Sequence, residues 1–257
     1  MADYLQVNSA SWNKKTEKHI HSEFYDVSGF KKSLNSLKEI ELGEMPDVKG
    51  KELLHLQCHF GLDTLSWAVK GARVTGVDFS DTAIHYAKEL AGELKINADF
   101  ICDDIYSFGE KNGKKYDIVY TSYGVLSWLP SISQWANLVS GSLKTGGIFY
   151  MAEFHPLHDL LIGYPYFYKK EPVKLDAETY TENSGEETNE ELEWTHPFSS
   201  VLDSLIKAGL MIQSVREYPF SPYPCFSGLE EREPGRYYFM HRNNPVPLVY
   251  TIRAVKT

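Results

Sequence analysis

The sequence predicts an α/β fold, with a doubly wound, mostly parallel sheet of seven strands, an antiparallel C-terminal hairpin and an inserted cap. Two observations lead to this fold class. From residue 51 onward, short apolar runs alternate with helical segments over short connections, which is typical of parallel βαβ units. The 257 residues are 42% hydrophobic and 24% charged, which is the composition of a globular protein with one large domain.

Residues 1–50 are polar with scattered aromatic residues, and we expect a helical lead-in to the sheet domain of residues 51–257. Leu34, Leu37 and Ile40 have the spacing of a short amphipathic helix. Turn-forming residues between Pro46 and Gly50 end this segment.

Five apolar segments predict the parallel strands, at residues 53–56, 73–77, 98–102, 116–120 and 148–153. Helical spacing predicts helices between them at residues 62–70, 82–94 and 135–143. Gly71 ends the first of these helices, and Ser80 stands at the N-cap position of the second.

The alternation stops at residues 155–196, which we expect to be an insertion over the carboxyl edge of the sheet. An aromatic run at residues 163–168 suits a lid, and nine acidic residues with one lysine follow between residues 171 and 193. An exposed loop is the simpler interpretation of this acidic stretch, and binding of a cationic substrate is the alternative. A helix at residues 198–208 and two strands at 210–218 and 247–256, forming the antiparallel hairpin, complete the fold.

Charge and cysteine content argue against several classes of protein. A formal net charge of −9 disfavours a nucleic-acid surface, which needs a basic patch. The three cysteines cannot form a disulfide framework, and none belongs to a C-x-x-C pair. The chain starts without signal-peptide features and has no apolar run of 18 residues. We expect a cytoplasmic protein without nucleic-acid or membrane partners, its oligomeric state left open.

Ligands of open α/β sheets bind beyond the carboxyl ends of the strands, so the residues after each strand are the candidate site. Gly61 belongs to a strand-to-helix turn that presents N–H groups to a ligand. Asp78 can accept both hydroxyls of a ribose, or can be only a neighbour of a helix cap. Asp103 and Asp104 can accept from an adenine amino group, with Ile105 on the ring, or can be a solvated loop pair. Neither G-x-G-x-x-G nor a P-loop is present, which disfavours dinucleotide enzymes and P-loop NTPases.

Five segments resemble, in order and spacing, the motifs of class I S-adenosylmethionine-dependent methyltransferases. They are residues 53–61, 77–80, 102–105, 116–119 and 143–147, and the resemblance is close over about residues 50–155. It implies a Rossmann-like fold, S-adenosylmethionine (SAM) as the cofactor, and methyl transfer to a small-molecule acceptor. A non-catalytic SAM-binding module and another nucleotide-dependent α/β enzyme are the alternatives.

The resemblance also implies roles for individual residues. Asp78 would hold the ribose hydroxyls and Asp104 the adenine amino group, while the turn after the first strand would surround the methionine end of SAM. Together, the implied cofactor-binding residues are Gln57, Cys58, His59, Gly61, Asp78, Phe79, Ser80, Asp103, Asp104, Ile105, Ser122 and Tyr123. The chain departs from the family at His55, where an acid is usual, and at Gln57 and His59, which replace two glycines.

Methyl transfer requires alignment of the acceptor and exclusion of water. A hydroxyl or amine acceptor must also lose a proton, and Glu153 and His155, together with Tyr123, are the candidate catalytic residues. The alternative is that Glu153 and His155 form a structural hydrogen-bonded pair. His55, Cys58 and His59 offer metal-ligand atoms, but strand geometry turns position 58 away from 55 and 59, so we expect no metal.

Overall fold

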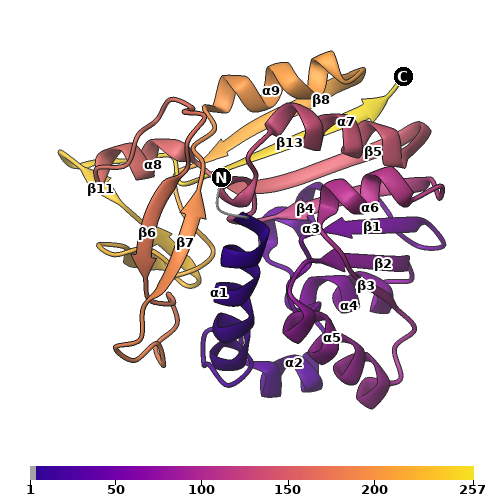
Figure 1. The fold of residues 1–257 in the computed structure, drawn as a ribbon, viewed down its shortest axis with the longest axis horizontal. Coiled ribbons are helices and arrows are strands. Elements are labelled where there is room, and N and C mark those ends of the chain that lie inside the picture. The colour runs from indigo at the N-terminus through magenta and orange to yellow at the C-terminus, as the bar shows by residue number, and fades with distance from the viewer. Residues whose placement is uncertain (1–3) are drawn as a thin grey trace.

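The computed structural model describes residues 4–257 and places a seven-stranded sheet between helices (Figure 1). The strand order is β3-β2-β1-β4-β5-β13-β8. The first five strands in the chain are parallel: β1 (Glu52–Leu56), β2 (Arg73–Asp78), β3 (Asp99–Cys102), β4 (Tyr116–Ser122) and β5 (Leu143–Phe154). The strand order reverses between β1 and β4, and the carboxyl ends at this switch point are where such sheets bind ligands.

The predicted antiparallel pair of C-terminal strands is confirmed. Strand β13 (Val249–Lys256) pairs antiparallel with β5 on one side and with the edge strand β8 (Leu210–Tyr218) on the other. The connection between β8 and β13 contains four short strands that the sequence did not predict, β9 (Glu230–Glu233), β10 (Arg236–Tyr238), β11 (Met240–His241) and β12 (Asn244–Pro245).

Successive side chains of a strand point to opposite faces of the sheet, so apolar strand residues form a hydrophobic core on each face. Leu54 and Leu56 of β1 join a buried cluster with Trp135, whereas Leu53 joins another with Trp67. Helices α6 (Ile105–Lys111), α7 (Ile132–Ser142) and α9 (Phe198–Lys207) cover the first face, and α4 (Leu62–Val69) and α5 (Asp81–Leu94) cover the other. Of these, α6 was not predicted.

The lead-in contains three helices, α1 (Tyr4–His19), α2 (Val27–Ser33) and α3 (Glu39–Glu44). The predicted helix through Leu34, Leu37 and Ile40 is wrong, because Leu34 adopts a left-handed conformation (φ 54°) that ends α2. Leu37 and Ile40 are nevertheless buried, Leu37 from the non-helical segment between α2 and α3.

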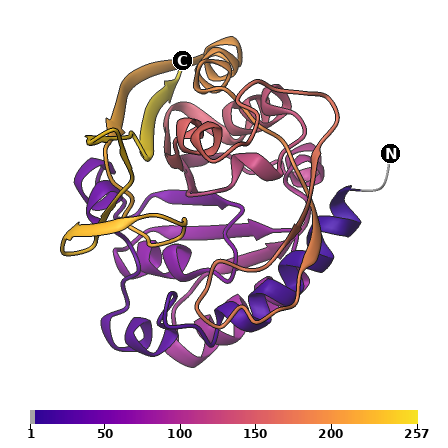
Figure 2. The same cartoon turned by 90° about the vertical axis from the view of Figure 1, so that its left-hand side faces the viewer.

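The insertion contains helix α8 (Pro156–Leu161) and a hairpin of β6 (Val173–Ala177) and β7 (Asn189–Glu193). Figure 2 shows this hairpin, in orange, lying along the indigo helix α1. Asn8 of α1 exchanges two hydrogen bonds of 2.9 Å with the backbone of Leu192 in β7. Two segments far apart in the sequence, residues 4–25 and 173–193, thus form one layer, which we call the cover.

Candidate cofactor and acceptor site

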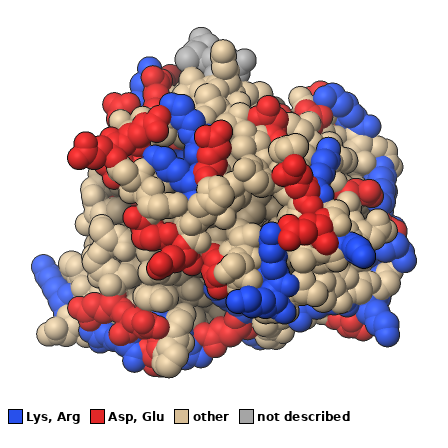
Figure 3. Space-filling view, turned by 90° about the horizontal axis from the view of Figure 1, so that it is seen from below, with Lys and Arg blue, Asp and Glu red and all other residues tan. Residues whose placement is uncertain are grey.

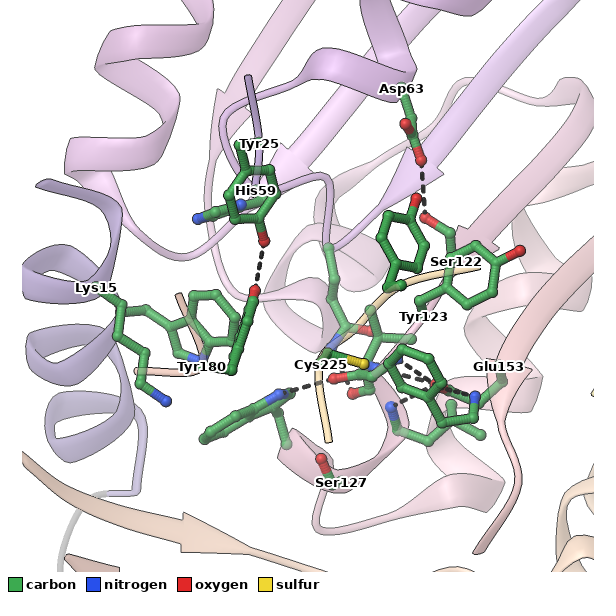
Figure 4. Close-up of a pocket in the computed structure, with 18 of the residues that line it drawn as sticks. Lys15, Tyr25, His59, Asp63, Ser122, Tyr123, Ser127, Glu153, Tyr180 and Cys225 are labelled. Atoms are coloured by element: carbon green, nitrogen blue, oxygen red, sulfur yellow. Dashed lines mark hydrogen bonds between the residues drawn. The ribbon is translucent and has the colours of Figure 1, made fainter. Parts of the chain in front are cut away.

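A cavity of about 990 Å³ lies where the carboxyl ends of β1, β2 and β4 meet the cover (Figure 4). In Figure 4, Lys15 of α1 lies on one side and Ser122 and Glu153 lie on the other. The predicted site residues that line it are Gln57, Cys58, His59, Gly61, Asp78, Phe79, Ser122, Tyr123 and Glu153. The predicted site residues outside the lining are Ser80, Asp103, Asp104, Ile105 and His155.

The turn after β1 keeps a glycine-like backbone although only one glycine remains. Gln57, His59 and Gly61 have positive φ angles of 57°, 51° and 83°. The Gln57 amide donates to the Val125 carbonyl at 2.9 Å, which leaves the Gln57 Oε1 buried without a partner among the described residues. The His59 ring packs against Trp12 of α1. Gln57 and His59, which stand where the family has glycines, therefore attach the turn to its neighbours and still have positive φ angles.

Asp78 is a buried acceptor at the carboxyl end of β2. Its two carboxylate oxygens accept from the backbone N–H groups of His59 (2.8 Å) and Ser80 (2.9 Å). Burial raises the pKa of Asp78 to about 6. A backbone hydrogen bond from Phe79 also acts on the pKa of Asp78, and because a carboxylate offers about four acceptor sites, Asp78 can also accept from a ligand in the cavity.

The residues after β3 are used differently from the prediction. Asp104 is the N-cap of α6 and accepts from the Ser107 N–H at 3.0 Å, and Asp103 pairs with Lys111 at 2.8 Å. The Asp103 N–H donates to the Asp78 carbonyl at 3.0 Å, so this turn adjoins the β2 turn. Asp103 and Asp104 do not line the cavity that Asp78 lines, and the Asp104 carboxylate caps α6.

A carboxylate that the sequence reasoning missed faces the cavity beside Ser122. Asp63, in the first turn of α4, accepts from the hydroxyls of Ser36 (2.5 Å), Ser122 (3.3 Å) and Tyr120 (3.4 Å). Burial raises the pKa of Asp63. The sequence feature that could have indicated Asp63 is its position two residues after Gly61, at the start of the helix that follows the turn. Asp63 thus supplies negative charge at the β1–β4 switch point.

His55 is neutral, because its burial lowers its pKa to about 3. Its Nδ1 lies 2.8 Å from the Thr64 hydroxyl. Residues 4–257 contain no group of three or more His, Cys, Asp or Glu side chains that could hold a metal ion. His55 lines the cavity, and its Nε2 lies 3.4 Å from the Ser122 hydroxyl.

Glu153 holds the loop that follows β4. Its carboxylate accepts from the backbone N–H groups of Val125 (2.9 Å) and Leu126 (3.1 Å), and also from Gly124 and Phe154. Burial raises its pKa, and these hydrogen bonds oppose the shift. With four backbone donors on one carboxylate, Glu153 is suited to positioning the loop.

The other two residues predicted for catalysis, Tyr123 and His155, also have hydrogen-bond or ion-pair partners within the protein. Tyr123, with φ 26°, lines the cavity and donates its hydroxyl to Glu41 at 2.8 Å. His155 caps α8 by accepting from the Leu157 N–H at 3.1 Å, and its Nε2 lies 3.0 Å from Glu217 of β8. Because both ring nitrogens of His155 are engaged outside the cavity, its predicted role as a base has no geometric support.

A buried ion pair joins the two segments of the cover. Lys15 Nζ lies 2.5 Å from Glu191 Oε1 of β7, and both side chains are buried. The same ammonium lies 5.4 Å from the ring centroids of Trp12 and Trp128. Of the predicted aromatic lid, Tyr164 lines the cavity, whereas Phe167 is 75% exposed.

Part of this chain is similar in sequence to known proteins. A sequence model described as a methyltransferase domain matches residues 53–147. The ubiquinone biosynthesis O-methyltransferase of Saccharophagus degradans is 30% identical over 146 residues, covering 56% of this chain and 61% of that protein. The Coxiella burnetii enzyme of the same name is 29% identical over 128 residues, covering 49% of this chain and 54% of that enzyme. This chain therefore spans little more than half the length of these relatives.

Solved structures share the fold. A putative S-adenosylmethionine-dependent methyltransferase from Listeria monocytogenes has a TM-score of 0.61 at 19% identity, covering 90% of this chain and 100% of that chain. Magnesium protoporphyrin IX methyltransferase from Synechocystis PCC 6803, crystallised with S-adenosylhomocysteine (SAH), has a TM-score of 0.59 at 14% identity, covering 99% and 100%. These matches and the 3-2-1-4-5 order of the parallel strands show that the chain shares the fold of these methyltransferase structures, and residues 53–147 match the methyltransferase-domain model.

Proposed function

We propose that this chain transfers a methyl group from SAM to a small-molecule acceptor inside the covered cavity. The observation that carries the proposal is Asp78, a buried carboxylate that faces this cavity from the carboxyl end of β2 and has lone pairs to spare. Two vicinal ribose hydroxyls are the donors that suit such a carboxylate.

The residues around Asp78 fit the rest of the cofactor. The unpartnered Gln57 Oε1 can accept from an N–H donor at the methionine end, and Phe79 offers a ring to the adenine. We place Ser122 and Tyr123 beside the sulfonium. When bound, SAM supplies a methyl group on a positively charged sulfur, whose departure leaves a neutral thioether.

The protein's own contribution is alignment and water exclusion, which can lower a barrier by about 7–11 kcal/mol. Glu153 fixes the backbone of residues 124–126 along one wall. We propose that Glu153 and His155 act through this framework and take no proton from the acceptor. The cover closes the other side through Lys15 and Glu191.

A small acceptor suits a cavity of about 990 Å³, which is within the range of small-molecule sites. The names of one sequence relative and one structural neighbour are in keeping with this, since they refer to ubiquinone biosynthesis and to magnesium protoporphyrin IX. The face seen in Figure 3 carries acidic and basic side chains side by side, which differs from the basic surface that nucleic acid needs. No helix within residues 4–257 has the length and apolarity to cross a bilayer. The three cysteines are free thiols, which supports the cytoplasmic location that we propose.

Calorimetric titration with SAH tests the proposal. We expect wild type to bind SAH and Asp78→Asn to bind it at least about tenfold more weakly, because the amide accepts with only one oxygen. Asp81→Asn is the matched control, since Asp81 is an exposed acid three residues away. Absence of binding by wild type, or equal binding by Asp78→Asn and Asp81→Asn, contradicts the proposal.

A further inference from the structure

The inner face of β7 carries charge where a cover would ordinarily carry apolar side chains. Glu191 and Glu193 alternate with Leu192, and both acids line the cavity, whereas Leu192 does not. Most acids of the stretch at residues 171–193 are exposed, as expected for an acidic loop. Glu191 and Glu193 differ from these exposed acids, because their positions on β7 direct both carboxylates toward the cavity.

Only one of these two carboxylates is neutralised by the protein. Glu191 accepts from the Ser11 hydroxyl and from the Lys15 ammonium, each at 2.5 Å. The Glu193 carboxylate forms no hydrogen bond or ion pair within residues 4–257, although the backbone of Glu193 pairs with Val173 of β6. Asp159 of α8 also lines this part of the cavity and adds a further negative charge. The acceptor side therefore has an excess of negative charge.

The electrostatic effect on Glu193 follows from its neighbours. Burial, then Glu191 of β7 and Asp159 of α8, raise the pKa of Glu193 to about 7, and Lys15 of α1 opposes the shift. A partly buried carboxylate without a counterion destabilises a fold. A positively charged ligand would supply the missing counterion.

Aromatic rings complete the surroundings of these acids. Trp128, Tyr164, Trp194 and Tyr250 line the cavity together with Glu193. The Lys15 ammonium lies 5.4 Å from the ring centroids of both Trp12 and Trp128 and beside the Glu191 carboxylate, so this wall already accommodates one cation next to aromatic rings and a carboxylate.

We propose that the acceptor side of the cavity is an ammonium-binding site, in which Glu193 pairs with a positively charged nitrogen of the methyl acceptor, and Asp159 and the rings support it. The acceptor is accordingly a cationic small molecule. This inference rests on the proposed function, because it takes the molecule bound beside Glu193 in the cavity to be the methyl acceptor. Glu193 is here a specificity-determining residue, and the ammonium is the group that it recognises.

Choline and its uncharged isostere 3,3-dimethyl-1-butanol test the inference by calorimetry on the SAH-saturated protein. We expect wild type to bind choline at least about tenfold more tightly than the alcohol. Glu193→Gln should abolish this preference and leave SAH affinity unchanged. Glu190→Gln is the matched control, because Glu190 is exposed on the same strand, and it should retain the preference.

Proton release gives a second measurement. Cation binding lowers the pKa of Glu193, so choline binding at pH 7 should release a fraction of a proton in wild type and none in Glu193→Gln. Comparison of binding enthalpies in phosphate and Tris buffers measures this release.

Equal binding of choline and the alcohol by wild type overturns the inference, and so does a preference that survives in Glu193→Gln. Failure of the proposed function looks different, because wild type would then not bind SAH at all. In that case, titration of the SAH-free protein with choline and with 3,3-dimethyl-1-butanol would still show tighter binding of choline if the ammonium site exists.

Discussion

The buried ion pair of the cover gives a sharp prediction about stability. Lys15→Met keeps an unbranched side chain beside Trp12 and Trp128 but removes the ammonium from Glu191. Glu191 would then be a buried carboxylate whose remaining side-chain hydrogen-bond donor within residues 4–257 is the Ser11 hydroxyl. Loss of one partner of a buried ion pair lowers the free energy of unfolding by about 3–5 kcal/mol.

The chain provides two controls for this prediction. Lys14 and Glu187 join the same helix to the same hairpin at 3.1 Å, with side chains 53% and 56% exposed, so Lys14→Met should cost less than about 1 kcal/mol. The double variant Lys15→Met/Glu191→Leu removes both buried charges and should return to within about 1 kcal/mol of wild type.

Urea unfolding followed by tryptophan fluorescence measures these free energies, since Trp12 and Trp128 flank the ion pair. Hydrogen exchange over residues 4–19 reports whether α1 detaches before the sheet unfolds. The reasoning is refuted if Lys15→Met costs no more than Lys14→Met, or if the double variant is as unstable as the single one.

Three further predictions concern the site. SAH affinity measured by calorimetry should fall as the pH drops below about 6, because the raised pKa of Asp78 protonates the acceptor of the ribose hydroxyls, and Asp78→Asn should remove this dependence. Glu153→Gln should lower the free energy of unfolding by about 1–3 kcal/mol in urea and weaken SAH binding, because an amide oxygen alone cannot serve the four backbone donors. His155→Gln should leave SAH affinity and methyl-transfer rate within about twofold of wild type, and a rate loss above about a hundredfold would restore His155 as a catalytic base.

The sheet and its flanking helices were predictable because burial there follows apolar periodicity. Leu53, Leu54 and Leu56 are fully buried, and Val201 and Leu205 of α9 form the apolar face that the spacing indicated. The short helix α6 was missed, because the residues that start it had been assigned to an adenine-binding turn.

Helix α1 could not be predicted in the same way, because the side chains it buries are polar. Asn8, Ser11, Lys15 and His19 are buried against partners that the chain supplies in the hairpin and in the turn after β1. Such a helix has no apolar stripe, and its partners lie 40 to 184 residues away in the sequence.

The candidate site was predictable where backbone geometry determines it. Gln57 and His59 stand where the family has glycines, but both have positive φ angles, so the strand-to-helix turn has the backbone conformation that glycines would allow. Asp63 and Glu193 could not be singled out, because the first depends on a cluster with Ser36 and Ser122, and the second on the register of β7.

A crystal structure of the SAH complex tests the central claim most directly. We predict that both ribose hydroxyls lie within hydrogen-bonding distance of the Asp78 carboxylate. We also predict that the amino-acid end of SAH lies against Gln57 and that its sulfur faces the part of the cavity that Glu193 lines. SAH bound outside this cavity, or bound in it without contact to Asp78, would contradict the account.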